Sequence, residues 1–246
     1  MYTNNYRRTF FRKNIIITGF NSGIGKKTCN QLLNLGANLI LLGRKNISFK
    51  KNKKVFFFKT DLENFIELEK NLKLIKKKFP KIDGFVHSAA QNQTKTIDKI
   101  STQEWMRIIN INLTSSFIIC RDLLENFKKS KKSSIVLISS IAGHRKSPVS
   151  GVHYVSSKSG IIGLVKQLSH EFGKYNIRIN CLCPSQTLTP MLLKSMNKSK
   201  LNILKKNIPL SRLAKTEEQS NVIIFLLSKL SSYINGATIN VDGGQI

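Results

Sequence analysis

The segment HYVSSK at residues 153–158 places a tyrosine four residues before a lysine. On a helix, side chains four positions apart lie on one face, so the phenol of Tyr154 and the ammonium of Lys158 would be neighbours. A phenol ordinarily titrates near pH ~10, and a fixed positive charge beside it lowers that pKa. The pair could therefore act as a general acid and base near neutral pH. Because this spacing also arises by chance, the rest of the chain must decide whether it is functional.

A glycine-rich segment, TGFNSGIG at residues 18–25, lies between an apolar run and a helical pattern. Gly19 permits a tight turn, while Gly23 and Gly25 let the backbone approach a phosphate and let the helix pack on the strand. The free N–H groups and the dipole of the following helix would bind a pyrophosphate. A strand, this loop and a helix in that order predict a dinucleotide-binding site.

The elements that must position these two segments alternate along the whole chain. Apolar runs predict strands at 14–18, 38–42, 55–59, 84–88, 134–139, 177–183 and 237–241. Helical patterns cover 23–36, 65–79, 101 to about 128 and 150–175, and the cap motifs STQE at 101–104 and TEEQ at 216–219 mark helix starts. The alternation is typical of an α/β fold with a single Rossmann-like, doubly wound, mostly parallel sheet and helices on both faces. We expect a basic tail at 1–13 and one domain at 14–246.

Composition and charge restrict the class of protein further. The chain has 246 residues, 41% of them hydrophobic, which suits one domain with a large core and excludes a disordered chain. Its formal charge is +28, which favours polyanionic ligands. A nucleic-acid-binding surface is one interpretation, but the lysines are spread over many segments and accompany abundant asparagine and isoleucine. Compositional drift toward A/T-rich codons is therefore the preferred reading, and a nucleic-acid partner is not expected.

The cysteines and the first residues bear on the cellular compartment. No spacing among the four cysteines suits a zinc site, and Cys181 and Cys183 are badly placed for a disulfide, so reduced packing cysteines and no metal are expected. The segment before Gly19 is too short for the apolar core of a signal peptide, although an organelle-targeting role for it stays open. No apolar run approaches membrane-spanning length. A cytoplasmic protein without a membrane partner is expected.

Further motifs follow the glycine loop in a fixed order: TDL at 60–62, NINLTSSF at 110–117, LISSIAG at 137–143, YVSSK at 154–158, INCLCPSQTLTPM at 179–191 and YINGATINVDGG at 233–244. Together with the TGxxxGxG spacing of the loop, they resemble the short-chain dehydrogenase/reductase family over about residues 14–246. The resemblance implies hydride transfer between NAD(P)(H) and a carbonyl/alcohol pair.

The resemblance implies a catalytic role for four residues. Tyr154 would donate the proton in reduction and accept it in oxidation, and Lys158 would lower its pKa and bond the nicotinamide ribose. Ser140, three residues before a glycine, would polarise the substrate carbonyl, with Ser139 as runner-up. Asn112 would hold a water linking Lys158 to solvent at a local helix distortion. Donors placed at the carbonyl oxygen would lower the barrier, because negative charge develops there as hydride arrives.

The resemblance also implies the contacts to the cofactor. Asp61 and Leu62 would border the adenine, and Thr187 and Thr189 would contact the carboxamide. The full expected set is Gly19, Asn21, Ser22, Gly23, Ile24, Gly25, Arg44, Asp61, Leu62, Ala89, Tyr154, Lys158, Pro184, Thr187 and Thr189.

The residues after the second predicted strand indicate which cofactor is preferred. An acidic residue there would bond the adenosine ribose hydroxyls and repel a phosphate. The sequence reads LLGRK, with no acid, and Arg44 could hold a 2′-phosphate. NADP(H) is therefore expected in preference to NAD(H), and the missing acid is the stronger evidence because basic residues are so common in this chain.

Three segments depart from the family pattern. HSAA at 87–90 stands where the family has a motif like NNAG, and His87 is interpreted as a packed histidine, with an extra catalytic role as the alternative. CPS at 183–185 replaces the usual Pro-Gly, so Ser185 fills a glycine position. The segment 43–54 is short, and the helix common there is expected to be reduced to a turn.

The substrate is the least constrained property. Residues 207–228 most resemble bacterial 3-oxoacyl-[acyl-carrier-protein] reductases, which dock an acidic carrier through basic residues near the active site. Lys131 could be one of these, while Tyr175 stands where another is usual. A sugar or other small polar alcohol is the alternative substrate. A non-catalytic NADP(H)- or nucleic-acid-binding protein is disfavoured because the whole expected catalytic set is present. The resemblance implies a homo-oligomer through the helices at 101–128 and 150–175, for which a tetramer is expected and a dimer is the alternative.

Overall fold

The computed structural model describes residues 9–45, 48–49, 52–195 and 198–246. Its centre is a seven-stranded sheet in the order β3-β2-β1-β4-β5-β6-β7, in which every neighbouring pair is parallel. The strands are β1 (Asn14–Thr18), β2 (Asn38–Gly43), β3 (Val55–Lys59), β4 (Gly84–His87), β5 (Ser134–Ile138), β6 (Arg178–Pro184) and β7 (Thr238–Val241). The expected α/β fold with one doubly wound sheet is confirmed.

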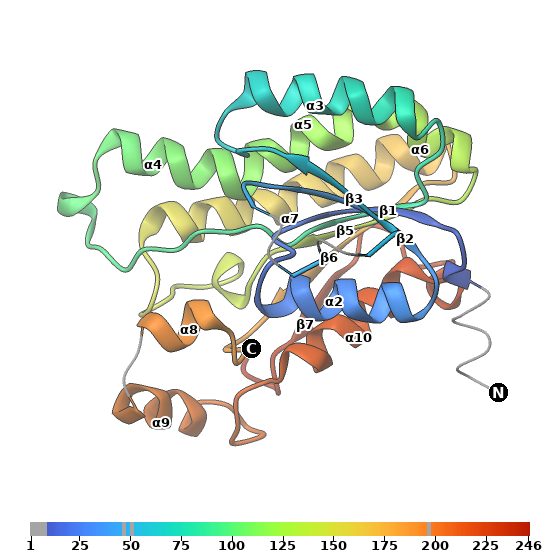
Figure 1. Cartoon of the computed structure of the whole chain (residues 1–246). Helices are drawn as coiled ribbons and strands as arrows, with labels where there is room; N and C mark the ends of the chain where they lie inside the picture. The colour runs from blue at the N-terminus through green and yellow to red at the C-terminus, as the bar shows by residue number, and fades with distance from the viewer. Residues whose placement is uncertain (1–8, 46–47, 50–51, 196–197) are drawn as a thin grey trace.

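Helices cover both faces of this sheet (Figure 1). One face carries α2 (Gly23–Asn34) and α10 (Thr216–Leu227). The other carries α3 (Phe65–Lys78), α4 (Thr102–Ile109), α5 (Ser115–Asp122), α6 (Leu124–Ser130) and α7 (Val152–Gly173). Two short helices, α8 (Pro190–Ser195) and α9 (Lys198–Lys206), lie beside the sheet's carboxyl edge. Because both faces are covered, the central strands are almost wholly apolar and buried, and two core clusters form, one on each side of the sheet.

Element ends agree with the sequence-based ranges to within two residues, with two exceptions. The helix expected at 101–128 is interrupted by a π-helical turn at Asn110–Thr114 and ends its α5 section at Asp122, before α6. The cap expected at Thr216 lies one residue earlier, since Lys215 is the N-cap and its N–H donates to Glu218 Oε2 at 2.7 Å. The cap at Ser101 is confirmed, because Ser101 and Glu104 form a reciprocal capping box.

The boundary of the folded domain also differs from the expectation. Phe10 is only 2% exposed and packs in the core cluster that includes α2, so residues just before position 14 belong to the domain rather than to a tail. Residues 1–8 of the expected basic tail lie outside the described residues. Between β2 and β3 the described residues contain no helix, as expected for the short segment there. Within the described ranges, none of the helices has the length and apolar character required to cross a bilayer.

The four cysteines are free and buried. Cys181 Sγ and Cys183 Sγ lie 3.9 Å apart on one face of β6, a contact distance rather than a bond. The interpretation as packing cysteines is therefore confirmed.

Candidate active site

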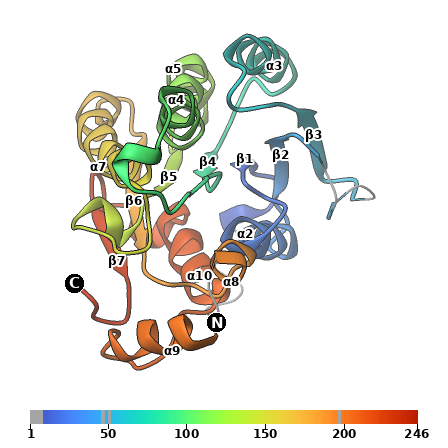
Figure 2. The same cartoon turned by 90° about the vertical axis from the view of Figure 1, so that its left-hand side faces the viewer.

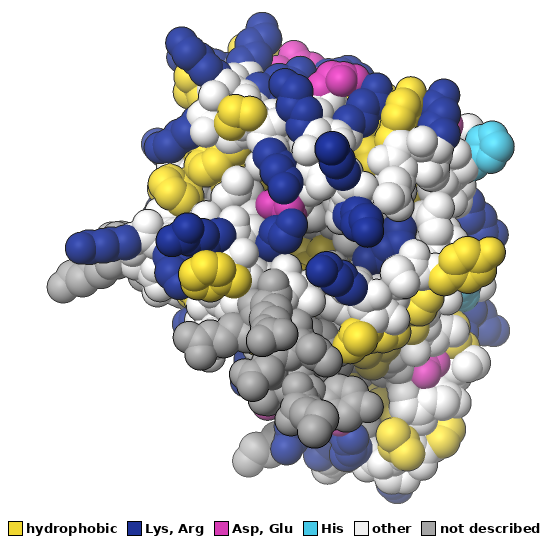
Figure 3. Space-filling model, turned by 90° about the vertical axis from the view of Figure 1, so that its right-hand side faces the viewer, with side chains coloured by type: hydrophobic (Ala, Val, Ile, Leu, Met, Phe, Trp, Pro, Cys, Tyr) yellow, Lys and Arg dark blue, Asp and Glu magenta, His cyan; other side chains and the backbone are white. Residues whose placement is uncertain are grey.

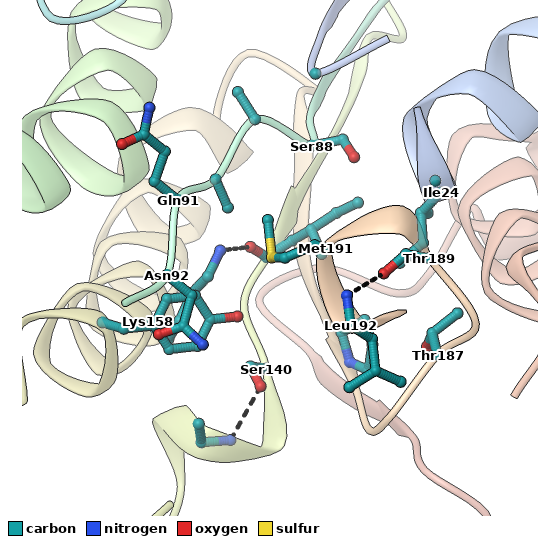
Figure 4. Close-up of a pocket in the computed structure, with 18 of the residues that line it drawn as sticks. Ile24, Ser88, Gln91, Asn92, Ser140, Lys158, Thr187, Thr189, Met191 and Leu192 are labelled. Carbon is teal, nitrogen blue, oxygen red and sulfur yellow. Dashed lines mark hydrogen bonds between the residues drawn. The ribbon is translucent and has the colours of Figure 1, made fainter. Parts of the chain in front are cut away.

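A cleft of about 1160 Å³ opens along the carboxyl ends of the strands, the edge that faces the viewer in Figure 2. Ligands in open α/β sheets bind at this edge, because the loops that follow the strands meet there. The cleft is lined from the glycine loop after β1 to α8 and α9, and it is large enough for a dinucleotide together with a small substrate. Figure 4 shows side chains from several of these elements converging on it.

The glycine loop closes one end of the cleft with its backbone. Gly19 has φ +69°, and a Cβ there would lie 2.5 Å from the backbone nitrogen of Ala89. A Cβ on Gly25 would lie 2.3 Å from the carbonyl oxygen of Gly19, so α2 packs directly on the loop. Gly19 and Gly23 line the cleft, whereas Gly25 lies behind them and holds the turn.

The start of α2 presents free donors to the cleft. Ser22 is the N-cap but makes no side-chain cap bond, and the first turn has no acidic residue. Ser22, Gly23 and Ile24 all line the cleft. The first N–H groups of a twelve-residue helix are thus available to an anion, which fits the pyrophosphate of a dinucleotide.

Basic side chains flank the expected adenosine end. Arg44 and Lys45 are exposed at the end of β2 and line the cleft, and so do Asp61 and Leu62, which follow the neighbouring strand β3. Arg44 forms no ion pair with any residue in the described ranges. Its guanidinium is therefore available to a phosphate group.

Three of the four expected catalytic side chains meet in the middle of the cleft. Ser140 follows β5, and Tyr154 and Lys158 come from the first two turns of α7. The side chains of Ser140 and Tyr154 line the same part of the cleft. Lys158 Nζ lies 5.5 Å from the centre of the Tyr154 ring and donates to the Ile138 carbonyl at 2.7 Å (Figure 4). The helix spacing thus brings phenol and ammonium together as the sequence predicts.

The electrostatics of this pair differ from the expectation. Burial raises the pKa of Tyr154 to about 12, and the neighbouring Ser140 hydroxyl opposes this rise only in part. Burial also lowers the pKa of Lys158 to about 8. The expected lowering of the tyrosine pKa by Lys158 is not seen in this structure, because the ammonium is directed at the Ile138 carbonyl and desolvation dominates.

The two neighbouring serines have different surroundings. Ser139 is 2% exposed, and its hydroxyl donates to the backbone carbonyl of Lys158 at 2.7 Å. Ser140 instead turns its hydroxyl toward the cleft, where it also accepts from the N–H of Ala142 at 3.1 Å. The geometry favours Ser140 as the residue that would contact a substrate oxygen.

Asn112 lies behind the cleft, within the π-helical turn, and is fully buried. Its Oδ1 accepts from Gln91 N at 2.8 Å, and its Nδ2 donates to Gln91 O and Ser157 Oγ, both at 3.0 Å. Ser157 Oγ in turn donates to the Tyr154 carbonyl at 2.7 Å. The expected helix distortion is confirmed. Through these hydrogen bonds, the Asn112 side chain connects the segment after β4 with α7.

The residues expected at the nicotinamide lie at the end of β6 and in the segment that follows it. Pro184, Thr187 and Thr189 line the cleft, with Thr187 Oγ1 donating to Ser185 O at 3.0 Å. Thr189 Oγ1 accepts from the N–H of Leu192 at 3.3 Å (Figure 4). The backbone of Ser185 is not in the left-handed region, so a serine at this position, where the family pattern has a glycine, causes no backbone strain.

The other expected cofactor residues, Asn21 and Ala89, also line the cleft. Sequence reasoning missed a second group, on the substrate side: Gln91, Asn92, Arg145, Lys146, Met191, Leu192, Leu204, Asn207 and Gln245. The first four come from the loops after β4 and β5, Met191 and Leu192 from α8, Leu204 from α9, and Asn207 and Gln245 from the segments after α9 and β7. Apart from Met191, which ends the motif at 179–191, none belongs to a motif, and only their position after the strands could have pointed to them. Lys131, the suggested carrier contact, precedes β5 and so lies at the opposite edge of the sheet from the cleft.

Comparison with known proteins identifies the family. A family model described as Enoyl-(Acyl carrier protein) reductase, built on short-chain dehydrogenase/reductase sequences, matches residues 19–245. The chain belongs to the short-chain dehydrogenase/reductase family. It is therefore an oxidoreductase of CH-OH and carbonyl groups with a nicotinamide cofactor.

Individual relatives of this short-chain dehydrogenase/reductase span nearly its whole length. The 3-oxoacyl-[acyl-carrier-protein] reductase of Chlamydia trachomatis is 33% identical, with 95% of this chain and 97% of the relative covered. The acetoacetyl-CoA reductase of an Acinetobacter species is 29% identical, with the same coverage of each chain. Among solved structures, aldohexose dehydrogenase of Thermoplasma acidophilum superposes with a TM-score of 0.86 at 26% identity, covering 96% of this chain and 94% of that one.

Proposed function

We propose that this enzyme is an NADPH-dependent reductase of 3-oxoacyl thioesters, with the acyl group delivered on an acyl-carrier protein. The observation that carries the reductase assignment is that Ser140, Tyr154 and Lys158 line one cleft together with the glycine loop. Two donors from different elements converge there on the place where a carbonyl oxygen would lie.

In this proposal the protein's residues orient the reactants and move one proton. A nicotinamide cofactor supplies the hydride when bound. Ser140 and Tyr154 hold the substrate oxygen, and Tyr154 transfers its phenolic proton to that oxygen as negative charge develops. Lys158, which also lines the cleft, would bond a ribose hydroxyl of the cofactor and supply positive charge. Asn112 acts from behind, where it fixes the backbone of Gln91 and the position of α7.

The NADP(H) preference is part of this proposal. It is supported by the exposed cations Arg44 and Lys45 at the end of β2 and by the absence of an acid there. A carboxylate at that position would repel a 2′-phosphate, whereas a guanidinium binds one with charge-assisted hydrogen bonds. NAD(H) is the alternative cofactor.

The thioester substrate is supported by the wall of the cleft and by the relatives. Ile141, Met191, Leu192 and Leu204 provide apolar surface for an acyl chain. Relatives named for acyl-carrier-protein and acetoacetyl-CoA substrates match over nearly the whole chain. The exposed cations Arg145 and Lys146 at the cleft suit an anionic carrier.

A second candidate substrate is a sugar or another small polar alcohol. Polar side chains of Gln91, Asn92, Asn207 and Gln245 also line the cleft, and amides of this kind bind hydroxyl-rich ligands. The structural likeness to an aldohexose dehydrogenase favours the same candidate.

Assembly and location complete the proposal. We expect a homotetramer, with a dimer as the alternative, formed through α4, α5 and α7. Support comes from Met106 and Phe117, which expose large apolar side chains on α4 and α5. Light scattering that gives a monomeric mass would refute this assembly. A cytoplasmic location is expected from the relatives and from the free cysteines.

The deciding experiment measures oxidation of NADPH and of NADH with acetoacetyl thioesters, and Tyr154→Phe serves as the control. We expect turnover that is faster with NADPH and falls by about 10²–10⁴-fold in the variant, because the proton donor is removed while the ring remains. Tight NADPH binding without thioester turnover would refute the thioester and shift the assignment to the polar alcohol. A Tyr154→Phe variant with undiminished turnover would refute the mechanism.

A further inference from the structure

The cleft carries two pairs of adjacent cations, and the expected cofactor accounts for only one of them. Arg44 and Lys45 follow β2 at the expected adenosine end, whereas Arg145 and Lys146 lie on the loop between β5 and α7. Both pairs are exposed, and among the described residues that line the cleft the one acid is Asp61, which follows β3. Two cationic sites in one cleft favour two anionic groups on the molecules that bind there.

The two pairs are too far apart to share one phosphate. They follow β2 and β5, which are separated in the sheet by β1 and β4. Three strand spacings correspond to about 14 Å across the sheet. The glycine loop, which follows β1, and the segment after β4 line the cleft between the two pairs. The expected 2′-phosphate would therefore contact the first pair only, and the second pair is left for a different anion.

The loop that carries the second pair is held on both sides of the pair. Before the pair, the carbonyl of Gly143 accepts from Ser159 Oγ of α7 at 2.8 Å. After the pair, the carbonyl of Val149 accepts from Thr94 Oγ1, in the segment after β4, at 2.9 Å. The two cations are therefore held beside the cleft, on the segment that also carries Ser140.

Within the described part of the chain, neither cation of the second pair has an anionic partner. None of the ion pairs there includes Arg145 or Lys146. A guanidinium binds phosphate oxygens through paired, charge-assisted hydrogen bonds, and an adjacent ammonium adds a point charge. The pair is therefore suited to a phosphate group on a molecule that occupies the Ser140 side of the cleft.

We propose that Arg145 and Lys146 bind the phosphate at the end of a pantetheine arm, the group through which both coenzyme A and an acyl-carrier protein present a thioester. This inference rests on the proposed function, because it assigns a further part of the same substrate. The thioester and the phosphate lie at opposite ends of the arm. An acyl group held at Ser140 and Tyr154 therefore leaves the phosphate to the exposed part of the cleft, where the pair lies. The pair would select phosphorylated substrates over simple thioesters.

Two thioesters that differ by a single phosphate test the pair: acetoacetyl-pantetheine and acetoacetyl-4′-phosphopantetheine. In the unmodified protein we expect the phosphate to lower KM by about 10–100-fold, because one or two hydrogen bonds to a charged group form. In a double variant with Arg145→Ala and Lys146→Ala, we expect the two thioesters to have nearly equal KM values. The loss should appear in KM rather than in kcat, since the pair contacts no reacting atom.

The matched control is a double variant with Lys53→Ala and Lys54→Ala, an adjacent exposed pair that does not line the cleft. It removes the same two positive charges, so it separates a local contact from the general field of a chain with formal charge +28. We expect this control to keep the full difference in KM between the two thioesters.

Titration with coenzyme A in the presence of saturating NADP⁺ provides a readout that needs no turnover. Saturation keeps coenzyme A, itself a nucleotide, out of the cofactor site. We expect the Kd for coenzyme A to rise by about tenfold or more in the Arg145→Ala, Lys146→Ala variant and to stay unchanged in the lysine control. If the unmodified protein reduces no thioester but this pattern appears, the proposed function fails and the phosphate site stands.

Three results would overturn the inference. One is a KM in the unmodified protein that does not depend on the phosphate. Another is an equal loss in the two double variants, which would make the effect one of net charge alone. The third is a rise in the Kd for NADPH in the Arg145→Ala, Lys146→Ala variant as large as the loss with the phosphorylated thioester, because the pair would then bind the cofactor instead of the substrate.

Discussion

At the scale of single residues, two adjacent serines after β5 are expected to have different roles, Ser140 in catalysis and Ser139 in the core. Ser140 lines the cleft together with Tyr154, whereas Ser139 donates to the carbonyl of Lys158 inside the core. Ser140→Ala should lower kcat by about 10²–10³-fold, because one of two donors to the developing oxyanion is lost. Ser139→Ala should cost about 1 kcal/mol of unfolding free energy and change kcat by less than tenfold. Steady-state kinetics and denaturant unfolding of both variants check this, and a reversed pattern would assign the role to Ser139.

In the same local way, we expect Arg44 to determine the choice of cofactor. Its guanidinium is exposed beside the expected adenosine end of the cleft and has no ion-pair partner in the described part of the chain. Arg44→Ala should raise the KM for NADPH by about 10–100-fold, because one or two hydrogen bonds to the charged 2′-phosphate are lost. The KM for NADH should stay nearly unchanged. Lys59→Ala, an exposed cation that does not line the cleft, is the matched control. Equal effects on both cofactors would contradict a specific contact to the 2′-phosphate.

At the scale of elements, the join between the glycine loop and α2 tolerates no side chain. Because a Cβ on Gly25 would lie 2.3 Å from the Gly19 carbonyl, Gly25→Ala must displace backbone. We expect a loss of about 1–3 kcal/mol of unfolding free energy and at least a tenfold rise in the Kd for NADPH. Gly173→Ala, where the nearest atom would be at an ordinary 3.5 Å, should change neither quantity appreciably. Fluorescence titration with NADPH and thermal unfolding measure both effects.

The elements also show where sequence reasoning succeeds and where it stops. Strands buried on both faces are continuous apolar runs, and the glycine loop and the Tyr154–Lys158 spacing are local patterns, so all of these could be predicted. The family resemblance implied a helix distortion at Asn112, but the residues NINLT alone carry no signal for a π-helical turn, because they are as compatible with an α-helix as with a wider turn. Its cause is tertiary: Asn112 bonds the backbone of Gln91, twenty-one positions away. The substrate-side residues of the cleft were missed for the same reason, since they meet only through the fold.

At the scale of the whole molecule, stability should fall in acid because of His87. The folded-state pKa of His87 is lowered to about 3 by burial, against an ordinary value of 6.5, and Lys158 adds to the lowering. Below pH 6.5 the unfolded chain therefore binds a proton at His87 that the folded chain does not bind. The stability of the folded state is unaffected by this group above pH 6.5 and falls as the pH decreases toward 3. The loss approaches about 1.4 kcal/mol per pH unit. Urea unfolding between pH 6.5 and 5 should show it in the unmodified protein and not in His87→Gln, and equal slopes would contradict it.

The excess of positive charge acts on the whole molecule as well. The chain has 41 lysines and arginines against 13 acidic residues, so most cations lack a carboxylate. Figure 3 shows many lysine and arginine side chains and few acidic ones on the face opposite the cleft. Mutual repulsion destabilises the compact state, and salt screens it over a Debye length of about 10 Å at 0.1 M. Raising sodium chloride from about 0.05 to 0.5 M should therefore raise Tm, and a falling Tm would mean that the ion pairs outweigh the repulsion.

The π-helical turn can also be regarded as a helix that carries one surplus residue. A π-turn closes its hydrogen bonds over five residues where an α-turn needs four, so deleting one residue from 110–114 would repair the helix. Every side chain of α5 would then keep its neighbours along the helix but rotate relative to the core, and Asn112 would lose the Gln91 backbone. An insertion or deletion in this helix should therefore disrupt the site by changing the rotation of the helix, an effect that single substitutions do not produce. Its length, and not only its residue types, is part of the active site.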